Sequence, residues 1–405
     1  MAKLEELIKE LCPNGVEYKF VGDVCDTITD YVAAGSFAEI AKKVKYINTP
    51  EYALLVRTTD LKSNFAKGDF IYIDKEAYDF LWRVHLDAET IILPNIGNCG
   101  EVYYITKDRL PYPHCALAPN AIMVRSSTCL NLYLKYVFES EYFQKQLMKI
   151  VSPTGQTKFN KTDLKRLLIP LPPLAVQREI VRILDKFTLY SQELAAELAA
   201  RRVQYEYYRD QLVSFNNKTE QIKWVLLQEI LEIKNGSDYK RFGEGQYPVY
   251  GSGGVMTYID NFIYDKPSVL IPRKGSLNNL FYVETPFWTV DTIFYTIIDT
   301  TKVVPKFVFY YLQNQHLEKL NKAGGVPSLT QSVLNLIKFP IPPLEVQERI
   351  VKVLDNFDAI CSDLGIGLPA EIEKRQQQYE FYRDKLLTFG TGSATIFTDR
   401  QTDRQ

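Results

Sequence analysis

The sequence carries the same long segment twice. Residues 170–187 read PLPPLAVQREIVRILDKF and residues 340–357 read PIPPLEVQERIVKVLDNF, with 11 of 18 positions identical at an offset of 170. A second block, residues 205–215, returns as residues 379–389 at an offset of 174, so four residues were gained or lost between the blocks. Self-similarity of this kind predicts that one structural unit is built twice within the chain.

The repeated blocks are predicted to be long helices. Pro172-Pro173 and Pro342-Pro343 mark their N-termini, because proline is tolerated in the first helical turn. Beyond them, mostly apolar residues recur at alternating spacings of four and three, the heptad pattern of a coiled coil. The four extra residues of the second copy fall at Gly365-Ile-Gly-Leu-Pro369, where glycine and proline are expected to interrupt the helix.

Two such helices in one chain most simply pack on each other. The segment between them must bring the chain back, so we expect an antiparallel pair. The alternative is two unrelated surface helices, which the matched sequence disfavours.

The segment ahead of each helix is predicted to be a variable α/β domain. Short β-branched and aromatic runs bounded by Gly, Pro, Asn and Asp indicate strands and turns. Ile92–Gly97 followed by Val102–Ile105 corresponds to Leu270–Gly275 followed by Leu280–Val283. The helices stayed alike while the domains diverged, as expected if the helices share a partner or a scaffold role and the domains bind two different ligands.

Composition and motifs exclude several classes of protein. The 405 residues predict two or three domains, and 48 basic against 49 acidic residues exclude a uniformly basic DNA binder, although a local basic face is possible. No apolar run reaches membrane-span length and the N-terminus lacks a signal-peptide pattern, so we expect a cytoplasmic protein without membrane contact. The six cysteines are scattered without zinc-binding spacing, and no metal site is predicted.

Catalytic motifs are also missing from the sequence. It contains no phosphate-binding loop of the G-x-x-x-x-G-K-[ST] type and no N-P-P-Y or D-P-P-Y amino-methyltransferase motif. The glycine-rich segments 251–254 and 390–392 lack a preceding strand and a following helix. We therefore expect a protein that is not an enzyme and binds no cofactor of its own.

The doubled motif resembles the specificity subunit of type I restriction–modification systems. The family pattern G-x-P-S-L-T, P-x-P-P-L-x-x-Q-x-x-I-V-x-x-L-D and Q-Y-x-x-Y-R-D-x-L-L-x-F is carried by residues 325–330, 340–355 and 378–389. The first copy carries it at 155–160, 170–185 and 204–215, with Thr157-Lys-Phe-Asn160 in place of Pro-Ser-Leu-Thr and without the Gly-Leu-Pro of the second copy. The resemblance covers the chain to about residue 389.

This resemblance implies a fold and a function. The fold is two α/β (α+β) target-recognition domains in a pseudo-two-fold arrangement, joined by two long helices that form an antiparallel coiled coil. Each domain would read half of a bipartite site in double-stranded DNA, and the helices would dock two modification (methyltransferase) subunits and through them restriction subunits. S-adenosylmethionine, ATP and Mg²⁺ are expected on those partners. The expected segments are 1–156 and 216–326 for recognition, 157–215 and 327–389 for the helical regions, and 390–405 for a disordered tail.

Polar and basic turns in the variable domains are the predicted DNA contacts. Basic side chains there can meet phosphate or guanine, and asparagines can pair with adenine edges. A plain solvated turn is the alternative for each of them. The predicted residues are Arg273, Lys274, Ser276, Asn278 and Asn279; Lys240, Arg241 and Tyr258, with Ser252 and Thr257 nearby; Asn95 and Asn98; and, as contacts to the DNA backbone, Lys158, Asn160 and Lys161 and the basic run Lys42, Lys43 and Lys45.

Residues that are identical in both copies yet lie off the heptad seam are the predicted partner contacts: Gln177, Arg209, Gln347 and Arg383. Two other functions stay open at this point. One is the recognition subunit of a related type II restriction system, and the other is a coiled-coil adaptor whose domains bind protein. The DNA sequence, the spacer length and the presence of a restriction subunit do not follow from the residues.

Overall fold

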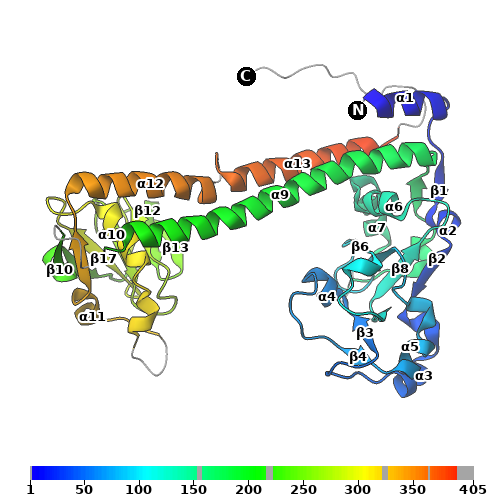
Figure 1. Ribbon diagram of the computed structural model, residues 1–405, viewed down its shortest axis with the longest axis horizontal. Helices are drawn as coiled ribbons and strands as arrows, with labels where there is room; N and C mark the ends of the chain where they lie inside the picture. The colour runs from blue at the N-terminus through cyan, green and yellow to red at the C-terminus, as the bar shows by residue number, and fades with distance from the viewer. Residues whose placement is uncertain (1, 153–156, 216–221, 322–326, 364, 390–405) are drawn as a thin grey trace. The chain divides into compact units, whose positions relative to one another are not determined.

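The chain divides into two compact units, residues 1–192 with 374–405 and residues 193–373. The structure is a computed structural model that describes residues 2–152, 157–215, 222–321, 327–363 and 365–389 (Figure 1). The motif glycines Gly155 and Gly325 and the predicted tail 390–405 lie outside the described residues. Each unit is described below by itself.

The first unit is an α+β domain with two sheets. A four-stranded antiparallel sheet has the order β2-β8-β5-β6, and a three-stranded sheet has the order β4-β3-β7 with β3 and β7 parallel. Strand β5 reads TIILP and is buried at every position, which explains why its sequence does not alternate between apolar and polar residues. The elements are α1 (Ala2–Leu11), β1 (Tyr18–Phe20), α2 (Val21–Val24), β2 (Thr27–Asp30), α3 (Phe37–Lys43), β3 (Ala53–Val56), α4 (Thr58–Lys62), β4 (Tyr72–Ile73), α5 (Lys75–Phe80), β5 (Thr90–Pro94), β6 (Tyr103–Ile105), β7 (Cys115–Leu117), β8 (Ala121–Arg125), α6 (Asn131–Glu139), α7 (Glu141–Ile150), α8 (Lys161–Leu164) and β9 (Leu168–Pro170).

The second unit also contains one four-stranded and one three-stranded sheet. Its sheets have the orders β11-β17-β14-β15 and β13-β12-β16. Strand β14 reads SVLIP and is buried throughout, like β5 of the first unit. The elements are β10 (Lys223–Leu226), β11 (Leu231–Asn235), β12 (Glu244–Gly251), β13 (Gly254–Ile259), β14 (Ser268–Pro272), β15 (Phe281–Val283), β16 (Trp288–Thr289), β17 (Ile293–Ile298), α10 (Pro305–Gln313), α11 (Gln331–Asn335), β18 (Lys338–Ile341) and α12 (Leu344–Ser362).

A short antiparallel strand pair closes each domain where its chain enters and leaves. In the first unit β1 pairs with β9, and the amide of Val21 donates to the carbonyl of Leu167 at 2.9 Å. In the second unit β10 pairs with β18, and the amide of Leu227 donates to the carbonyl of Ile337 at 2.9 Å. The two ends of each variable segment therefore lie side by side, in the same way in both units.

The repeated blocks form the predicted helices. Helix α9 (Leu174–Val213) runs unbroken for 40 residues and begins directly after Pro172-Pro173. Its first half belongs to the first unit and packs against α13 (Leu368–Leu387), where Phe187 stacks on Tyr382 at 5.4 Å and Arg375 lies 5.2 Å over the ring of Tyr190 (Figure 1). Ascending positions on α9 meet descending positions on α13, so the predicted antiparallel pairing is confirmed.

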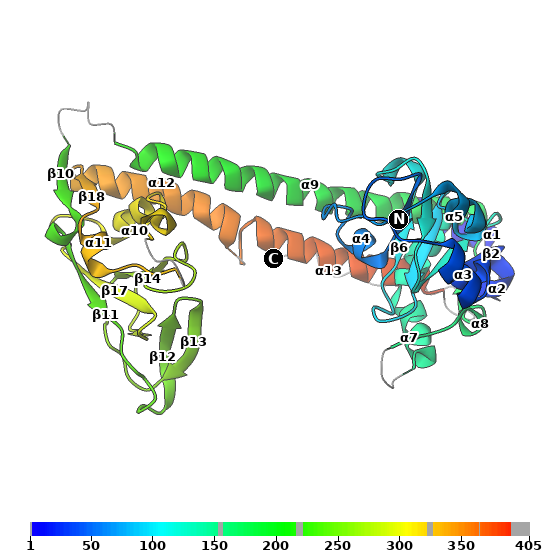
Figure 2. The ribbon, with the colours of Figure 1, turned by 90° about the horizontal axis from the view of Figure 1, so that it is seen from below.

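The second half of α9 packs in the same way against α12, within the second unit. The rings of Tyr208 and Phe357 lie 5.7 Å apart, and Tyr205 and Leu212 join the apolar core that contains Ile350 and Leu354. Figure 2 shows the C-terminal half of α9 running beside α12. The predicted interruption is also confirmed, because α12 ends at Ser362 and α13 begins at Leu368. A side chain at Gly367 would lie 2.5 Å from the carbonyl oxygen of Ala359, so the chain can turn this closely only with glycine there.

Candidate nucleic-acid interface

One loop is held by the same backbone hydrogen bonds in both domains. In the first domain, Gly97 N donates to Thr157 O at 2.8 Å and Phe159 N donates to Asn95 O at 3.1 Å. In the second, Gly275 N donates to Pro327 O at 3.1 Å and Leu329 N donates to Arg273 O at 2.9 Å. Gly97 and Gly275 have φ values of 86° and 85°. The predicted equivalence of these turns is confirmed: the repeated segment ahead of the helix fixes a loop whose sequence differs between the domains.

The first-domain loop presents few free polar groups. Asn98 and Lys158 are exposed. Asn95 is half-buried, and its Nδ2 donates to the carbonyl of Phe159 at 3.2 Å. Asn160 caps helix α8, since its Oδ1 accepts from the amide of Asp163 at 2.9 Å and its Nδ2 donates to the Asp163 carboxylate at 2.7 Å. Asn160 therefore caps α8, and its predicted contact with the DNA backbone stays a prediction.

The second-domain loop is more polar and more accessible. Lys274, Ser276 and Asn278 are exposed. Arg273 is partly buried, with its Nη1 donating to the carbonyl of Asp291 at 3.4 Å. Asn279 is also partly buried, and its Nδ2 donates to the carbonyl of Ser252 at 3.0 Å. The Asn278 side chain is thus accessible, and its contact with a base stays a prediction, whereas the amide of Asn279 holds the neighbouring hairpin.

That hairpin adds a second surface to the loop. Ser252 lies in the turn between β12 and β13, and β13 is an edge strand of its sheet. Val255, Met256 and Tyr258 on β13 are 46%, 58% and 53% exposed. Tyr258 is one of the predicted residues, whereas Val255 and Met256 were not predicted, although they follow a glycine-rich turn in the sequence.

The basic pair Lys240-Arg241 lies on the segment ahead of β12. Both side chains are exposed, and the guanidinium of Arg241 lies 4.8 Å over the ring of Phe242. Phe242 in turn packs edge-to-face on Trp288, with 4.7 Å between the ring centroids. Since Trp288 belongs to the sheet that contains the hairpin, the basic pair and the hairpin are parts of one packed layer.

The prediction that Gln177 and Gln347 contact a partner is wrong, because both side chains are buried. The Oε1 of Gln177 accepts from the amide of Leu130 at 3.0 Å, and its Nε2 donates to the carbonyl of Pro172 at 2.8 Å. Gln347 repeats this arrangement with Val304 N at 2.8 Å and Pro342 O at 2.8 Å. Each glutamine joins its helix to the domain in front of it.

Arg209 and Arg383 are also alike in the two copies. Each guanidinium is bound by the next residue, Asp210 or Asp384, at 2.9 and 3.0 Å. Only 16% and 15% of the two arginine side chains are exposed. Their role as partner contacts stays a prediction, limited to a small accessible surface.

A matched tyrosine–aspartate pair was missed by the sequence analysis. The Tyr136 hydroxyl donates to Asp185 at 2.5 Å, and the Tyr310 hydroxyl donates to Asp355 at 2.5 Å. Both aspartates belong to the repeated Leu-Asp dipeptide, which was the available signal. Burial, and after it the hydrogen bond to aspartate, raises the pKa of both tyrosines. The two bonds also connect each helix to its domain.

We expect Gln347→Leu to lower the free energy of unfolding by about 2–4 kcal/mol, since it leaves the part-buried amide of Val304 and the buried carbonyl of Pro342 without their partner. Urea denaturation measures this loss. Gln228→Leu, the same change at an exposed position, is the control and should stay within about 0.5 kcal/mol of the starting protein. Equal stability of the two variants would show that the buried glutamine does not hold the helix to its domain.

Among the residues that the structure describes, no helix is both long and apolar enough to cross a bilayer. No group of three or more His, Cys, Asp or Glu side chains among them could hold a metal ion.

The chain is similar to proteins of one kind. A family model for the type I restriction modification DNA specificity domain matches residues 13–200 and 220–374. The EcoR124I/EcoR124II specificity subunit of Escherichia coli is 33% identical over 261 residues, covering 56% of this chain and 63% of that protein. A putative type I specificity subunit of Mycoplasma pneumoniae is 31% identical over 238 residues, covering 54% of this chain and 92% of that protein. The match thus spans less than two thirds of the Escherichia coli relative.

Solved structures share the fold. A chain from a study of complex assembly and conformational transition of the type I R-M system gives a TM-score of 0.63 at 16% identity, covering 93% of this chain and 98% of that chain. The S subunit of a type I restriction–modification system from M. genitalium gives a TM-score of 0.53 at 17% identity, covering 92% and 96%. At these identities the likeness concerns the fold alone.

Proposed function

Because the chain belongs to the family of type I restriction–modification DNA specificity domains, we propose that it is the sequence-reading subunit of such a complex and has no catalytic activity of its own. Each domain would read one half of a bipartite site in double-stranded DNA. One observation carries this proposal: identical backbone bonds hold the loops at Asn95–Gly97 and Arg273–Gly275, while the side chains on these loops differ. A common frame with different loops is what two modules for two different half-sites require.

The partners and cofactors follow from this role. We propose that the paired helices dock two modification subunits, one for each unit, and restriction subunits through them. S-adenosylmethionine, ATP and Mg²⁺ would bind those partners, in the cytoplasm where the DNA is. The net charge of −1 is too low for strong phosphate binding by this chain alone, so the modification subunits would supply most phosphate contacts.

A recognition subunit of a related type II system would have the same architecture, and the sequence of the neighbouring subunit separates the two. A coiled-coil adaptor that binds only protein is separated by fluorescence anisotropy with duplex DNA, measured with and without the modification subunits. An adaptor would leave the anisotropy unchanged in both cases.

Native mass spectrometry of the co-expressed complex tests the partner assignment. We expect two modification subunits per chain, because each unit carries its own helix pair and its own glutamine and tyrosine contacts. A 1:1 species that persists at saturating modification subunit would overturn this assignment.

Two exposed residues of the second loop should behave differently. We expect Lys274→Ala to weaken binding to all sequences and to reduce the salt dependence by about one phosphate contact, since its ammonium is a candidate for backbone contact. Asn278→Ala should instead cost about 1–3 kcal/mol on the specific site alone and relax the choice of base at one position. Anisotropy titrations over a range of salt, on specific and random duplexes, measure both effects. Identical behaviour of the two variants would contradict the assignment.

A further inference from the structure

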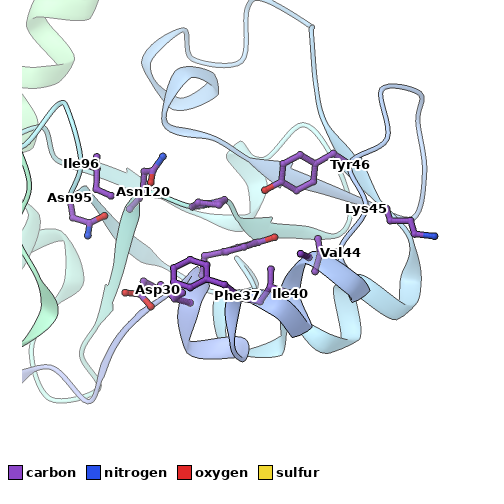
Figure 3. A pocket seen from close by; sticks show the side chains of 14 residues that line it. Asp30, Phe37, Ile40, Val44, Lys45, Tyr46, Asn95, Ile96 and Asn120 are labelled. Atoms are coloured by element: carbon purple, nitrogen blue, oxygen red, sulfur yellow. The ribbon is translucent and has the colours of Figure 1, made fainter. Parts of the chain in front are cut away.

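A cleft of about 670 Å³ opens in the first domain beside the loop at Asn95–Gly97, the held loop of this domain. Figure 3 shows Phe37 and Ile40 of α3, with Val44 directly after the helix, on one side of this cleft, and Asn95 and Asn120 on the opposite side. Tyr46 closes a further side, above α3 in this view. One wall is thus apolar and aromatic, and the facing wall carries side-chain amides. The cleft includes Asn95 of the held loop, so it continues the proposed DNA-reading surface.

The apolar wall is unusually accessible. Phe37 is 81% exposed and Tyr46 is 53% exposed. Helix α3 does not need the Phe37 ring for its own stability, because Ser36 and Glu39 already form a capping box at its N-terminus. Large exposed aromatic side chains around a hollow mark a binding surface rather than a packing surface.

The charges around the cleft favour a polyanion. Lys45 lines it, and Lys42 and Lys43 form the last turn of α3. The two nearby acids are already engaged: Lys161 lies 2.7 Å from Asp30, and the Glu39 carboxylate accepts hydrogen bonds from Ser36. The hydrogen bond from the Ser36 amide is the main cause that lowers the pKa of Glu39, so this carboxylate stays ionised within its cap. Lys42, Lys43 and Lys45 outnumber the one ionised carboxylate of Glu39, so the net charge around the cleft is positive.

The amide wall is held in place from behind. The backbone amide of Asn95 donates to the backbone carbonyl of Asn120 at 3.0 Å, and Asn120 has a positive φ of 73°. The side chain of Asn120 is exposed, and none of the described residues shares a hydrogen bond with it. A side-chain amide in this position can offer one donor and one acceptor to a base edge.

We propose that this cleft receives the major-groove edge of one A·T base pair in the half-site read by the first domain. Adenine presents N7 and N6–H₂ in the major groove, which an asparagine amide matches, and thymine presents its C5-methyl group, which suits an apolar wall. The adenine edge and the thymine methyl group belong to one base pair, and the amide wall and the apolar wall line one cleft. Asn120 would meet the adenine and Phe37 the thymine methyl. This assignment rests on the proposed function, since it names one base pair within the site.

A double-mutant cycle between protein and DNA tests the proposal. The probe is a duplex that carries the complete site found by methylation mapping, and each thymine is replaced in turn by uracil, which removes only the methyl group. Binding of the complex with modification subunits is measured by anisotropy. We expect one position, in one half-site only, where uracil weakens binding about fourfold, the effect of exposing one methyl group. With Phe37→Ala the same replacement should have no effect.

Trp82→Ala is the matched control. Trp82 is an aromatic residue of the same domain, 62% exposed and outside the cleft, so this variant should keep the fourfold effect. The proposal is overturned if no thymine matters, or if Phe37→Ala keeps the full sensitivity to uracil. It is also overturned if Phe37→Ala releases a modification subunit in native mass spectrometry with unchanged uracil sensitivity, because the cleft would then bind protein. Failure of the complex to bind any mapped site would instead refute the proposed function.

Discussion

Replacing residues 21–167 with the matching segment of a relative is expected to change one half of the methylated DNA motif and to leave the other half unchanged. The cut points lie just inside the β1–β9 pair, which keeps the ends of the variable segment together. The exchanged segment keeps the loop, the cleft and the sheets of the first domain in one piece. The original half-site should be lost almost completely, because each mismatched base pair costs about 1–3 kcal/mol and several pairs change at once.

Methylome sequencing of a strain that carries the exchanged chain measures this outcome. The reciprocal exchange of residues 228–336, inside the β10–β18 pair, is the control and should change the other half. If either exchange altered both halves together, the two domains would not read DNA independently.

Deleting Ala195–Leu198 is expected to leave both half-sites unchanged and to shorten the spacer between them by one or two base pairs. These residues belong to the tandem tetrapeptide Glu193-Leu-Ala-Ala-Glu-Leu-Ala-Ala200, through which α9 runs without a break. Four residues correspond to about 6 Å of helix at ~1.5 Å per residue, against ~3.4 Å per base pair along a DNA strand. The helix rotates by about 40° more than one full turn, so the apolar seam is roughly preserved.

The same methylome measurement reports the spacer. A length-preserving variant, Ala195→Gln with Ala199→Gln at two exposed positions, is the control and should keep the original spacer. An active deletion variant with an unchanged spacer would show that helix length does not set it, and that the tetrapeptide serves only as good helix-forming sequence.

The helices could be predicted because the repeated segments, the heptad spacing and the positions of the prolines can all be read directly from the sequence. The same signals located the interruption near Gly365 and the equivalence of the Gly97 and Gly275 turns. Gln177 and Gln347 show where this reasoning fails. Identity between copies marks a shared environment, but it does not distinguish a shared partner from a shared internal contact. Only the backbone groups of Leu130 and Val304, far away in sequence, show that the environment is internal.

The recognition surface was harder to predict, because its residues come together from separate segments. Phe37 and Tyr46 flank the basic run Lys42, Lys43 and Lys45, which was predicted, but nothing in the sequence shows that the two aromatic side chains are exposed, because their exposure depends on the packing of α3. Asn279 was chosen as a base-reading residue for its chemistry, and its amide is instead bound to Ser252, a bond that nothing in the sequence indicates. Asn160 was chosen as a contact to the DNA backbone, and it caps α8, a role for which asparagine is a preferred residue.

The first unit is built from two separate stretches of the chain, and this has a consequence for how the protein is synthesised. Its core includes Leu386, Leu387 and Phe389, and the hydroxyl of Tyr18 donates to the carbonyl of Phe389 at 2.9 Å. Residues 193–373, the whole second unit, leave the ribosome in between. At about 5–20 residues per second this takes on the order of 10–40 s. During that time the apolar surface that Leu386, Leu387 and Phe389 will cover stays exposed to solvent. The first unit is therefore completed last, although its synthesis begins first.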